Sequence, residues 1–249
     1  MIYQEFAKFY DDLFDETLYD KWFNYTSKRV KQSERLLDLA CGTGRLAVKL
    51  AKAGYQVNGA DLSEDMLTMA DQRARQAGLS IPFFQLDMRN LEELPMYGAV
   101  TCFDDSLCYL TTCSDLKQTF FEVYQHLVEG GRFLFDVITP YQTDQVYPGY
   151  MYNFQDNERA FMWTSYAAED VLHGVEHDLS FFLYNPKKDA YDVYQELHKE
   201  RTYPVDDYRK LLTEIGFSKI QVTTNFGTAP FKNKVKRWLF DCRKEIISA

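Results

Sequence analysis

The sequence lacks the features that mark membrane and exported proteins. No apolar run reaches the ~18 residues that a membrane span needs, and Met1–Glu5 lacks the basic and apolar regions of a signal peptide. The 249 residues include five cysteines. An odd number of cysteines without an export signal predicts reduced thiols in a cytoplasm. We therefore expect a cytoplasmic protein without a membrane segment.

The sequence also has few of the features needed to bind a metal ion or a nucleic acid. Cys108 and Cys113 lie near each other, but no histidine or cysteine joins them at metal-site spacing, so no metal is expected. The net charge of −9 disfavours a nucleic-acid partner, since phosphate binding normally needs a basic face. We interpret the local basic run at 232–237 as a solvated strand edge or loop. The length fits one large domain, or a core domain with an insertion.

The most informative segment that is present is 36–46, which joins a short apolar run to an expected helix over Arg45–Lys52. Its loop contains Gly42 and Gly44, which tolerate positive φ and place no Cβ against a ligand. A strand that enters a helix through such a loop presents free backbone N–H groups to a bound ligand. The dinucleotide fingerprint needs a third glycine, and Ala47 stands in its place. A nucleotide-dependent dehydrogenase is therefore disfavoured.

The run Asp38-Leu39-Ala40-Cys41-Gly42-Thr43-Gly44 resembles the first motif of the class I S-adenosylmethionine (SAM)-dependent methyltransferases. In that family the loop surrounds the amino-acid end of the cofactor, and the leading acid helps to fix the loop. The resemblance assigns five residues to SAM binding: Asp38, Ala40, Cys41, Gly42 and Gly44. It implies an α/β fold with a Rossmann-like, seven-stranded, mostly parallel sheet and helices on both faces.

A second strand, expected over Gln56–Asp61, ends in an acid. Asp61 lies about 20 residues past the glycine loop, where nucleotide-binding α/β proteins place a carboxylate for the ribose hydroxyls. The resemblance gives Asp61 the same role. Ser63 is the expected N-cap of the next helix, and Leu62 and Met66 are expected to line the cofactor site.

Two later strand ends complete the set. The segment that ends at Asp87-Met88 resembles the family's third element, in which an acid accepts from the adenine amino group and its neighbour packs against the ring. The segment that ends at Asp104-Asp105 resembles the fourth element, at the rim where methyl acceptors bind. Asp104 is expected to contact the cofactor and Asp105 the substrate. Both could instead cap a strand and open a turn.

Changes of pattern along the chain predict its organisation. Residues 1–33 are aromatic-rich and helical in pattern, and could be core packing or a lid. Tyr10 lies in a run that resembles the Tyr-Asp element of small-molecule methyltransferases, whose hydroxyl reaches the SAM carboxylate. Residues 34–138 and 204–249 are expected to form the SAM-binding domain. Residues 139–203 predict three or four antiparallel strands inserted after the fifth core strand.

The later core elements are also predicted by pattern. The expected ranges are a helix over Ser114–Glu129 ended by Gly130-Gly131, a buried strand over Arg132–Val137, a helix over Asp206–Ile215 closed by Gly216, and an edge pair over Phe217–Thr224 and Val235–Cys242 whose last strand is antiparallel.

The resemblance also implies the chemistry. Because the methyl group of SAM is on a positively charged sulfur, the protein mainly needs to hold a nucleophile about 3–3.5 Å from the methyl carbon. A base is needed only if the acceptor arrives protonated. His198, on an expected strand of the insertion, is the candidate base, although a surface or core histidine is the alternative. Tyr109 and Tyr184 are expected to line the substrate pocket through their aromatic faces.

We predict a SAM-dependent methyltransferase that acts on a small molecule at nitrogen or oxygen. Nitrogen is preferred because the insertion is similar in architecture to that of glycine/sarcosine and amino-sugar N-methyltransferases, where it covers the acceptor or makes a dimer contact. A homodimer is thus one possible assembly. The chain lacks the Asn/Asp-Pro-Pro-aromatic and Pro-Cys sequences of nucleic-acid methyltransferases. The alternatives are a non-catalytic SAM-binding subunit or sensor, and an enzyme that uses a modified SAM.

Overall fold

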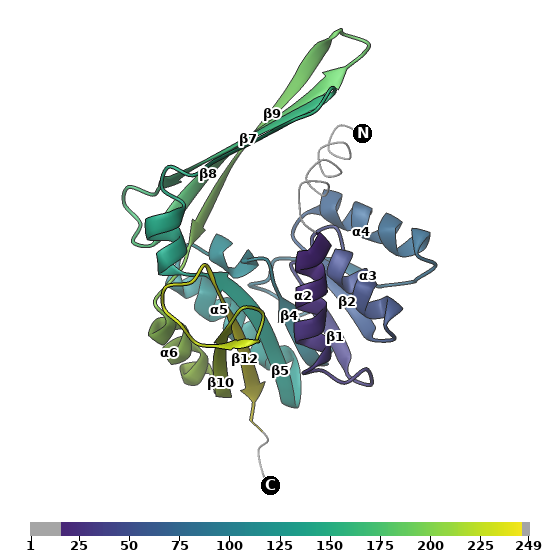
Figure 1. Ribbon diagram of the computed structural model, residues 1–249. Helices are drawn as coiled ribbons and strands as arrows, with labels where there is room; N and C mark the ends of the chain where they lie inside the picture. The colour runs from purple at the N-terminus through teal and green to yellow at the C-terminus, as the bar shows by residue number, and fades with distance from the viewer. Residues whose placement is uncertain (1–15, 246–249) are drawn as a thin grey trace.

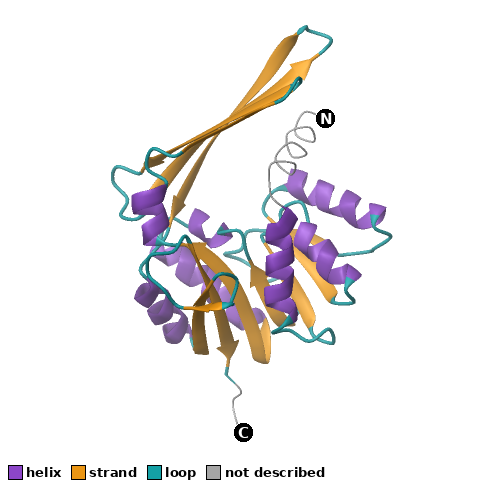
Figure 2. Ribbon diagram, viewed as in Figure 1, coloured by secondary structure: helices purple, strands orange, loops and turns teal. Residues whose placement is uncertain are grey.

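Two β-sheets with different strand directions and surroundings make up the framework of the protein. The computed structural model describes residues 16–245. The larger sheet has eight strands and carries helices on both faces, whereas a sheet of four strands extends away from it as an arm (Figure 1). Figure 2 shows that the arm consists almost entirely of strands and loops.

The larger sheet, in the spatial order β11-β10-β12-β5-β4-β1-β2-β3, comprises β1 (Arg35–Leu39), β2 (Gln56–Asp61), β3 (Phe83–Gln85), β4 (Tyr97–Cys102), β5 (Leu127–Ile138), β10 (Phe217–Thr224), β11 (Ala229–Pro230) and β12 (Arg237–Lys244). The smaller sheet comprises β6 (Met151–Gln155), β7 (Arg159–Ala167), β8 (Gly174–Asn185) and β9 (Ala190–Arg201). The helices are α2 (Glu16–Ser27), α3 (Arg45–Lys52), α4 (Glu64–Gln76), α5 (Cys113–His126), α6 (Val205–Ile215) and the short turns η1 (Ser106–Tyr109) and η2 (Gln142–Val146). No helix within residues 16–245 is long and apolar enough to cross a membrane.

The sequence pattern of the first half of the larger sheet gives the observed elements. The predicted ranges of α3 and β2 are those of the structure, and the Ser63 hydroxyl caps α4 by accepting from the backbone N–H of Met66. β1 pairs in parallel with β2 and β4, and β4 pairs in parallel with β5. Because β1, β2, β4 and β5 all run in the same direction, their carboxyl ends lie at one edge of the sheet.

The core lies on both faces of the larger sheet, as the alternation of strand side chains requires. Leu36 belongs to the apolar cluster under α2 and α3, whereas the adjacent Leu37 belongs to the cluster that includes α5 and α6. Leu134 and Phe135 divide in the same way between the two faces. The buried strands therefore read as continuous apolar runs, and helices cover both faces of the sheet.

Two boundaries differ from the prediction around the fifth strand. α5 ends at His126 rather than Glu129, and β5 already begins at Leu127. Leu127 is fully buried and pairs with Tyr97 of β4, which holds it in an extended conformation. The Lys244 ammonium donates to the backbone oxygens of Tyr124 and Leu127. These tertiary contacts end the helix three residues earlier than the two glycines would.

The carboxy-terminal part of the sheet largely follows the prediction. Gly216, with a φ of 116°, ends α6, and β12 is antiparallel to both β5 and β10. β12 spans Arg237–Lys244, two residues later than expected. The two-residue strand β11 adds an eighth strand beside the seven that were predicted.

The arm confirms the prediction of an antiparallel insertion. Its four strands pair in sequence order, and β8 and β9 form a long hairpin of twelve residues each. One face of the arm is apolar around Phe161, Leu179 and Phe181, which form a separate small core. The arm therefore has its own packing and is joined to the larger sheet at its base.

The described part of the amino-terminal segment packs against the larger sheet. Trp22 and Tyr25 of α2 are both buried, and the Trp22 ring stacks on Phe103 with centroids 6.0 Å apart. The Tyr25 hydroxyl donates to the backbone oxygen of Phe240, at 3.2 Å. Core packing, one of the two interpretations from the sequence, thus describes α2.

We expect Gly44→Ala to destabilise the protein more than Gly78→Ala. Both residues have positive φ, 73° and 70°, which costs an L-residue roughly 1–2 kcal/mol. A Cβ at Gly44 would also lie 2.8 Å from the Cβ of Ala70, whereas nothing lies within 4 Å at Gly78. Overpacking should add about 1–3 kcal/mol to the loss at Gly44. Urea unfolding of the two variants measures the difference, and equal losses would contradict the close packing of α3 on α4.

Candidate functional site

Two cavities meet at the carboxyl edge of the parallel strands, the edge where open α/β sheets bind ligands. The larger cleft, of about 840 Å³, lies over the ends of β1, β2 and β4. The smaller cavity, of about 380 Å³, lies between that edge and the base of the arm. The linings of the two share three residues: Asp104, Tyr109 and His198.

The glycine loop forms one wall of the larger cleft. Ala40, Gly42 and Gly44 all have left-handed backbones, with φ of 55°, 52° and 73°. Such a backbone is strained for Ala40, and strain of this kind is found mainly at functional sites. Ala40, Cys41 and Gly42 line the cleft, and Gly44 lies behind them as the residue before α3.

Asp38 presents an unsatisfied oxygen at the end of β1. Its Oδ1 accepts from the Thr101 hydroxyl at 2.8 Å, whereas its Oδ2 is buried and has no hydrogen-bond partner within the described part of the chain. Burial raises the pKa of Asp38 to about 7. Because an isolated buried carboxylate is costly, a positively charged group in the cleft would stabilise the ionised form.

Asp61 links the second strand end to the glycine loop. Its Oδ2 accepts from the backbone N–H of Gly42 at 2.8 Å, and its Oδ1 accepts from that of Ser63 at 2.9 Å. Burial raises the pKa of Asp61, although these hydrogen bonds oppose the shift. A carboxylate has about four lone-pair sites, so Asp61 can still accept from hydroxyl groups in the cleft. Leu62 and Met66 line the cleft beside it.

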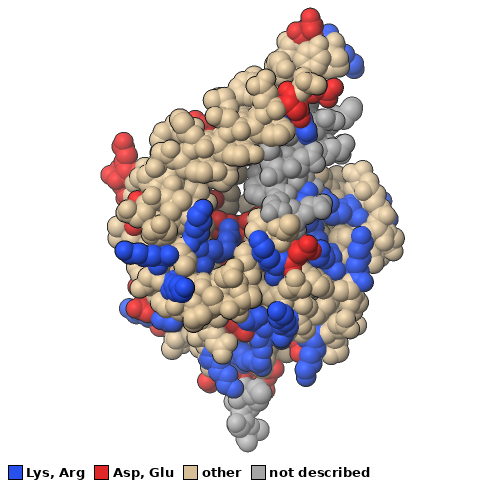
Figure 3. Space-filling model, viewed as in Figure 1, with Lys and Arg blue, Asp and Glu red and all other residues tan. Residues whose placement is uncertain are grey.

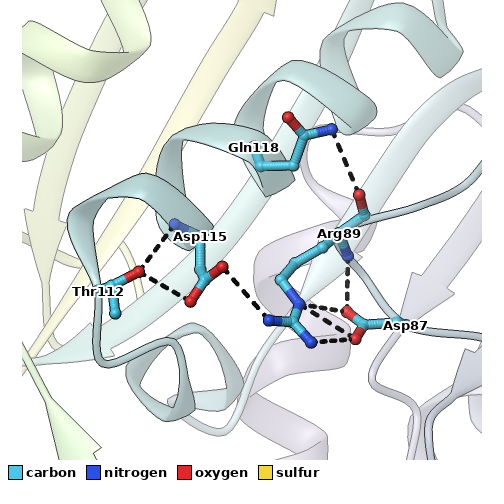
Figure 4. A network of polar contacts seen from close by, with 5 residues as sticks. All are labelled: Asp87, Arg89, Thr112, Asp115 and Gln118. Carbon is cyan, nitrogen blue, oxygen red and sulfur yellow. Dashed lines mark hydrogen bonds and ion pairs between the residues drawn. The ribbon is translucent and has the colours of Figure 1, made fainter.

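Asp87 is held in a network that the sequence did not indicate (Figure 4). Arg89 binds both of its oxygens and also reaches Asp115 at 3.3 Å, and Thr112 and Gln118 extend the network. The hydrogen bonds from Arg89 lower the pKa of Asp87. Asp87, Met88 and Arg89 all line the cleft. The sequence analysis placed Asp87 and Met88 there but missed Arg89, which binds the carboxylate oxygens of Asp87.

Asp104 and Asp105 follow β4 with left-handed backbones, φ of 58° and 49°. Arg237 of β12 binds Asp105 at 3.0 Å and Asp136 at 2.7 Å, and lies 3.7 Å from Asp104. Burial and the neighbouring Asp105 raise the pKa of Asp104 to about 7. The interpretation of the basic run as solvated was therefore wrong for Arg237, whose guanidinium belongs to this buried cluster.

Asp136 of β5 is the most deeply buried member of the ion cluster that it forms with Arg237 and Asp105. It is fully buried in β5, and its oxygens accept from the Trp22 indole N–H at 2.6 Å and from the backbone N–H of Asp105 at 2.9 Å. Sequence reasoning missed both Asp136 and Arg237. An acid within the otherwise apolar run 133–138 was the signal that could have identified Asp136.

Tyr109 and His198 form the wall that the two cavities share. The Tyr109 hydroxyl lies 2.7 Å from Nδ1 of His198, and His198 Nε2 lies 2.6 Å from a carboxylate oxygen of Glu196. If Nε2 donates to the carboxylate, Nδ1 is left to accept from the tyrosine. The set Glu196–His198–Tyr109 therefore forms a hydrogen-bonded chain that ends at a hydroxyl beside both cavities.

The smaller cavity combines aromatic rings with acidic groups. Tyr147, Tyr150 and Trp163 pack edge-on or tilted against one another, with centroids 5.3–6.2 Å apart. Asp105 and Glu200 also line it. Viewed from outside, acidic atoms lie in the hollow below the arm, with Lys and Arg side chains at its rim (Figure 3).

Tyr184, predicted to line the substrate pocket, is not brought to either cavity. Tyr184 pairs with Tyr191 near the far end of the β8–β9 hairpin, and its hydroxyl donates to Asp189. It lines neither cavity, because twelve-residue strands carry it away from the base of the arm. Its assignment to the substrate pocket is therefore corrected. Tyr10 lies outside the described residues.

A family model, two proteins and a solved structure, each similar to this chain, are methyltransferases by name. A family described as "Methyltransferase domain" matches residues 36–131. A protein of Geobacillus sp. (strain WCH70) named "Putative methyltransferase" is 39% identical over 249 residues, covering 98% of this chain and 100% of the relative. The glycine/sarcosine N-methyltransferase of Halorhodospira halochloris is 28% identical over 194 residues, 77% of this chain and 68% of the relative. The crystal structure of a SAM-dependent methyltransferase from Clostridium acetobutylicum ATCC 824 has 30% identity and a TM-score of 0.85, covering 99% of this chain and 100% of that one.

We expect Asp38→Asn to change how stability depends on pH. Because the pKa of Asp38 is raised from 3.8 to about 7, the folded state binds more protons than the unfolded state between these values. The free energy of unfolding of the wild type should therefore fall as pH rises through this window, by up to about 4 kcal/mol from this residue.

The asparagine cannot ionise, so the stability of Asp38→Asn relative to wild type should rise from pH 4 to pH 8. Urea unfolding across this range measures the trend, with Asp170→Asn in an exposed loop as the control. Parallel curves for Asp38→Asn and wild type would contradict a pKa of Asp38 raised by burial.

Proposed function

Since the chain belongs to the SAM-dependent methyltransferases, we propose that it transfers the methyl group of SAM to a small-molecule acceptor in the smaller cavity. We propose nitrogen as the attacking atom. The observation that carries the proposal is the meeting of the two cavities at Asp104, Tyr109 and His198. A group transfer between two ligands needs two sites that open onto each other, and the shared wall supplies that arrangement.

In this proposal the larger cleft holds SAM. The unsatisfied Oδ2 of Asp38 fits the cationic amino group of its amino-acid end. The free lone pairs of Asp61 fit the ribose hydroxyls, and Asp87 with Met88 fits the adenine end. SAM, when bound, supplies a methyl group already activated on a positively charged sulfur. The acidic groups at the strand ends favour such a cationic ligand.

Arg89 lies where the adenine of SAM is proposed to bind and competes with it for Asp87. Its guanidinium binds both oxygens of Asp87, so an adenine amino group must share this carboxylate or displace the arginine. An ionised carboxylate can accept at about four positions. We therefore assign Arg89 to holding Asp87 in its ionised form at the rim of the cleft.

The proton of the acceptor is the next requirement. An amine that arrives protonated must lose a proton before its lone pair can attack carbon. We assign this step to the Tyr109 hydroxyl, backed by His198 and Glu196, because this chain ends at the shared wall. The proton passes from the amine to the phenol oxygen while the phenol proton passes to Nδ1 of His198. The candidate base from the sequence thus acts through Tyr109.

The choice of nitrogen rests on two supports. The smaller cavity is acidic and aromatic, which attracts an amine that is cationic in solution. In addition, the Halorhodospira halochloris relative is by name an N-methyltransferase. We further propose that the segment 139–203 serves as the cover of the acceptor, since the base of the arm supplies Trp163, His177 and Glu200 to the cavity.

We expect Asp61→Ala to weaken binding of both SAM and S-adenosylhomocysteine (SAH) by about tenfold or more, because it removes hydrogen bonds to a charged group. Calorimetric titration of each ligand measures the dissociation constant. Asp71→Ala, on the exposed side of α4, is the matched control and should bind like wild type. Absence of SAM and SAH binding to the folded wild type would overturn the proposed function.

We expect Tyr109→Phe to lower the rate of methyl transfer rather than the affinity for SAM. Loss of a positioned proton acceptor costs roughly 10²–10⁴ in rate. Transfer of a radiolabelled methyl group from SAM to a panel of small amines finds an acceptor, and kcat and KM are then compared between variants. Tyr166→Phe, exposed on the other face of the arm, is the control. An unchanged kcat in Tyr109→Phe would remove Tyr109 from the mechanism.

A further inference from the structure

The smaller cavity has more acidic than basic groups. Asp104, Asp105 and Glu200 line it, and among residues 16–245 Arg237 is the one lysine or arginine in its lining. Arg237 is already bound to Asp136 and Asp105, so its charge is offset at the floor of the cavity. Within the described part of the chain, Asp104 shares Arg237 with these two carboxylates at 3.7 Å, whereas no lysine or arginine forms an ion pair with Glu200.

Glu200 combines deep burial with one carboxyl oxygen that has no hydrogen-bond partner among the described residues. It is only 7% exposed, and its Oε2 is buried with no hydrogen-bond partner among residues 16–245. Burial and the nearby Asp105 raise the pKa of Glu200 well above its ordinary value. A buried carboxyl of this kind is stabilised in its charged form when a cation binds beside it.

His177 does not supply that cation. Its Nε2 lies 4.0 Å from Glu200 Oε1, but its Nδ1 accepts from the Trp163 indole N–H at 3.2 Å and lies 2.7 Å from the Ser165 hydroxyl. Burial lowers the pKa of His177 to about 4. The imidazole is therefore neutral at neutral pH.

Aromatic rings surround the same space. The ring centroids of Tyr147 and His177 are 4.7 Å apart. The rings of Tyr147, Tyr150 and Trp163 pack against one another next to His177. Aromatic faces attract ammonium groups, and the attraction strengthens when water is excluded. An anionic ligand would instead be repelled by the carboxyl groups of this lining that are ionised.

We propose that the smaller cavity selects molecules that carry a protonated amine and no carboxylate or phosphate, with Glu200 as the anchor of the ammonium group. This inference rests on the proposed function for its meaning, since it names the class of methyl acceptor. It also separates this protein from a relative that is named for glycine and sarcosine, both of which carry a carboxylate.

Three probes with the same ring and different charge test the selection: cyclohexylamine, cyclohexanol and cyclohexanecarboxylate. Each is titrated calorimetrically into the full protein at neutral pH, with and without saturating SAH. We expect the amine to bind at least about tenfold more tightly than the alcohol, as for a hydrogen bond to a charged group, and the carboxylate more weakly than either. Equal or tighter binding of the alcohol or the carboxylate would overturn the inference.

Glu200→Gln should reduce amine affinity about tenfold while it leaves the affinity for the alcohol and for SAH near that of wild type. Glu176→Gln is the matched control, because Glu176 lies on the adjoining strand and pairs with Lys199 instead. If Glu200→Gln keeps the wild-type preference for the amine, Glu200 is not the anchor.

The two proposals fail separately. Binding of SAH together with equal binding of amine and alcohol would overturn the charge selection alone. Selective amine binding by a protein that binds neither SAM nor SAH would leave the charge selection in place and overturn the proposed methyl transfer.

Discussion

The buried ion cluster of Arg237, Asp136 and Asp105 is the interaction on which the rest of the site depends. It joins β12, β5 and the turn after β4, three segments that lie far apart in the sequence. Trp22 attaches α2 to the same carboxylate. Because loss of one partner leaves a buried charge uncompensated, at a cost of roughly 3–5 kcal/mol, the cluster must form as a unit. It fixes the edge of the sheet where both cavities open.

The cluster also explains the unusual backbone beside it. Two consecutive aspartates with left-handed φ are costly, and the hydrogen bond from the Asp105 N–H to Asp136 holds this turn in place. The turn leads into η1, which carries Tyr109 to the shared wall. From the other side, β9 carries His198 and Glu200 to the same point. The arm and the segments at the edge of the larger sheet thus both contribute to the proposed acceptor site.

The parts of the site that the sequence predicted are those determined by local pattern. The glycine loop lies in the unit β1–loop–α3, and Asp61 and the Ser63 cap lie in the next unit, β2–loop–α4; the structure has these elements where the sequence predicts them. The parallel sheet and the antiparallel arm also follow from periodicity and turn residues. In these regions local preference and tertiary packing agree.

The missed residues are those whose partners are distant in sequence. Arg237 lies 101 residues from Asp136, and no spacing rule indicates that a basic run will place one of its members in a buried cluster. The same holds for Arg89 with Asp115, and for the pairing of Tyr109 with His198, 89 residues apart. The end of α5 was misjudged for a similar reason, since Lys244 and Tyr97 decide it. The placement of Tyr184 in the substrate pocket was wrong because residue type alone does not show how far along a hairpin a side chain lies.

A crystal structure of the protein with SAH tests most directly whether the larger cleft holds the cofactor and the smaller cavity the acceptor. We expect the ribose beside Asp61, the amino group at Asp38, and the sulfur at the wall formed by Asp104, Tyr109 and His198, directed toward the smaller cavity. A ligand whose sulfur lies away from this wall, or one that occupies the smaller cavity instead, would contradict the division into cofactor cleft and acceptor cavity.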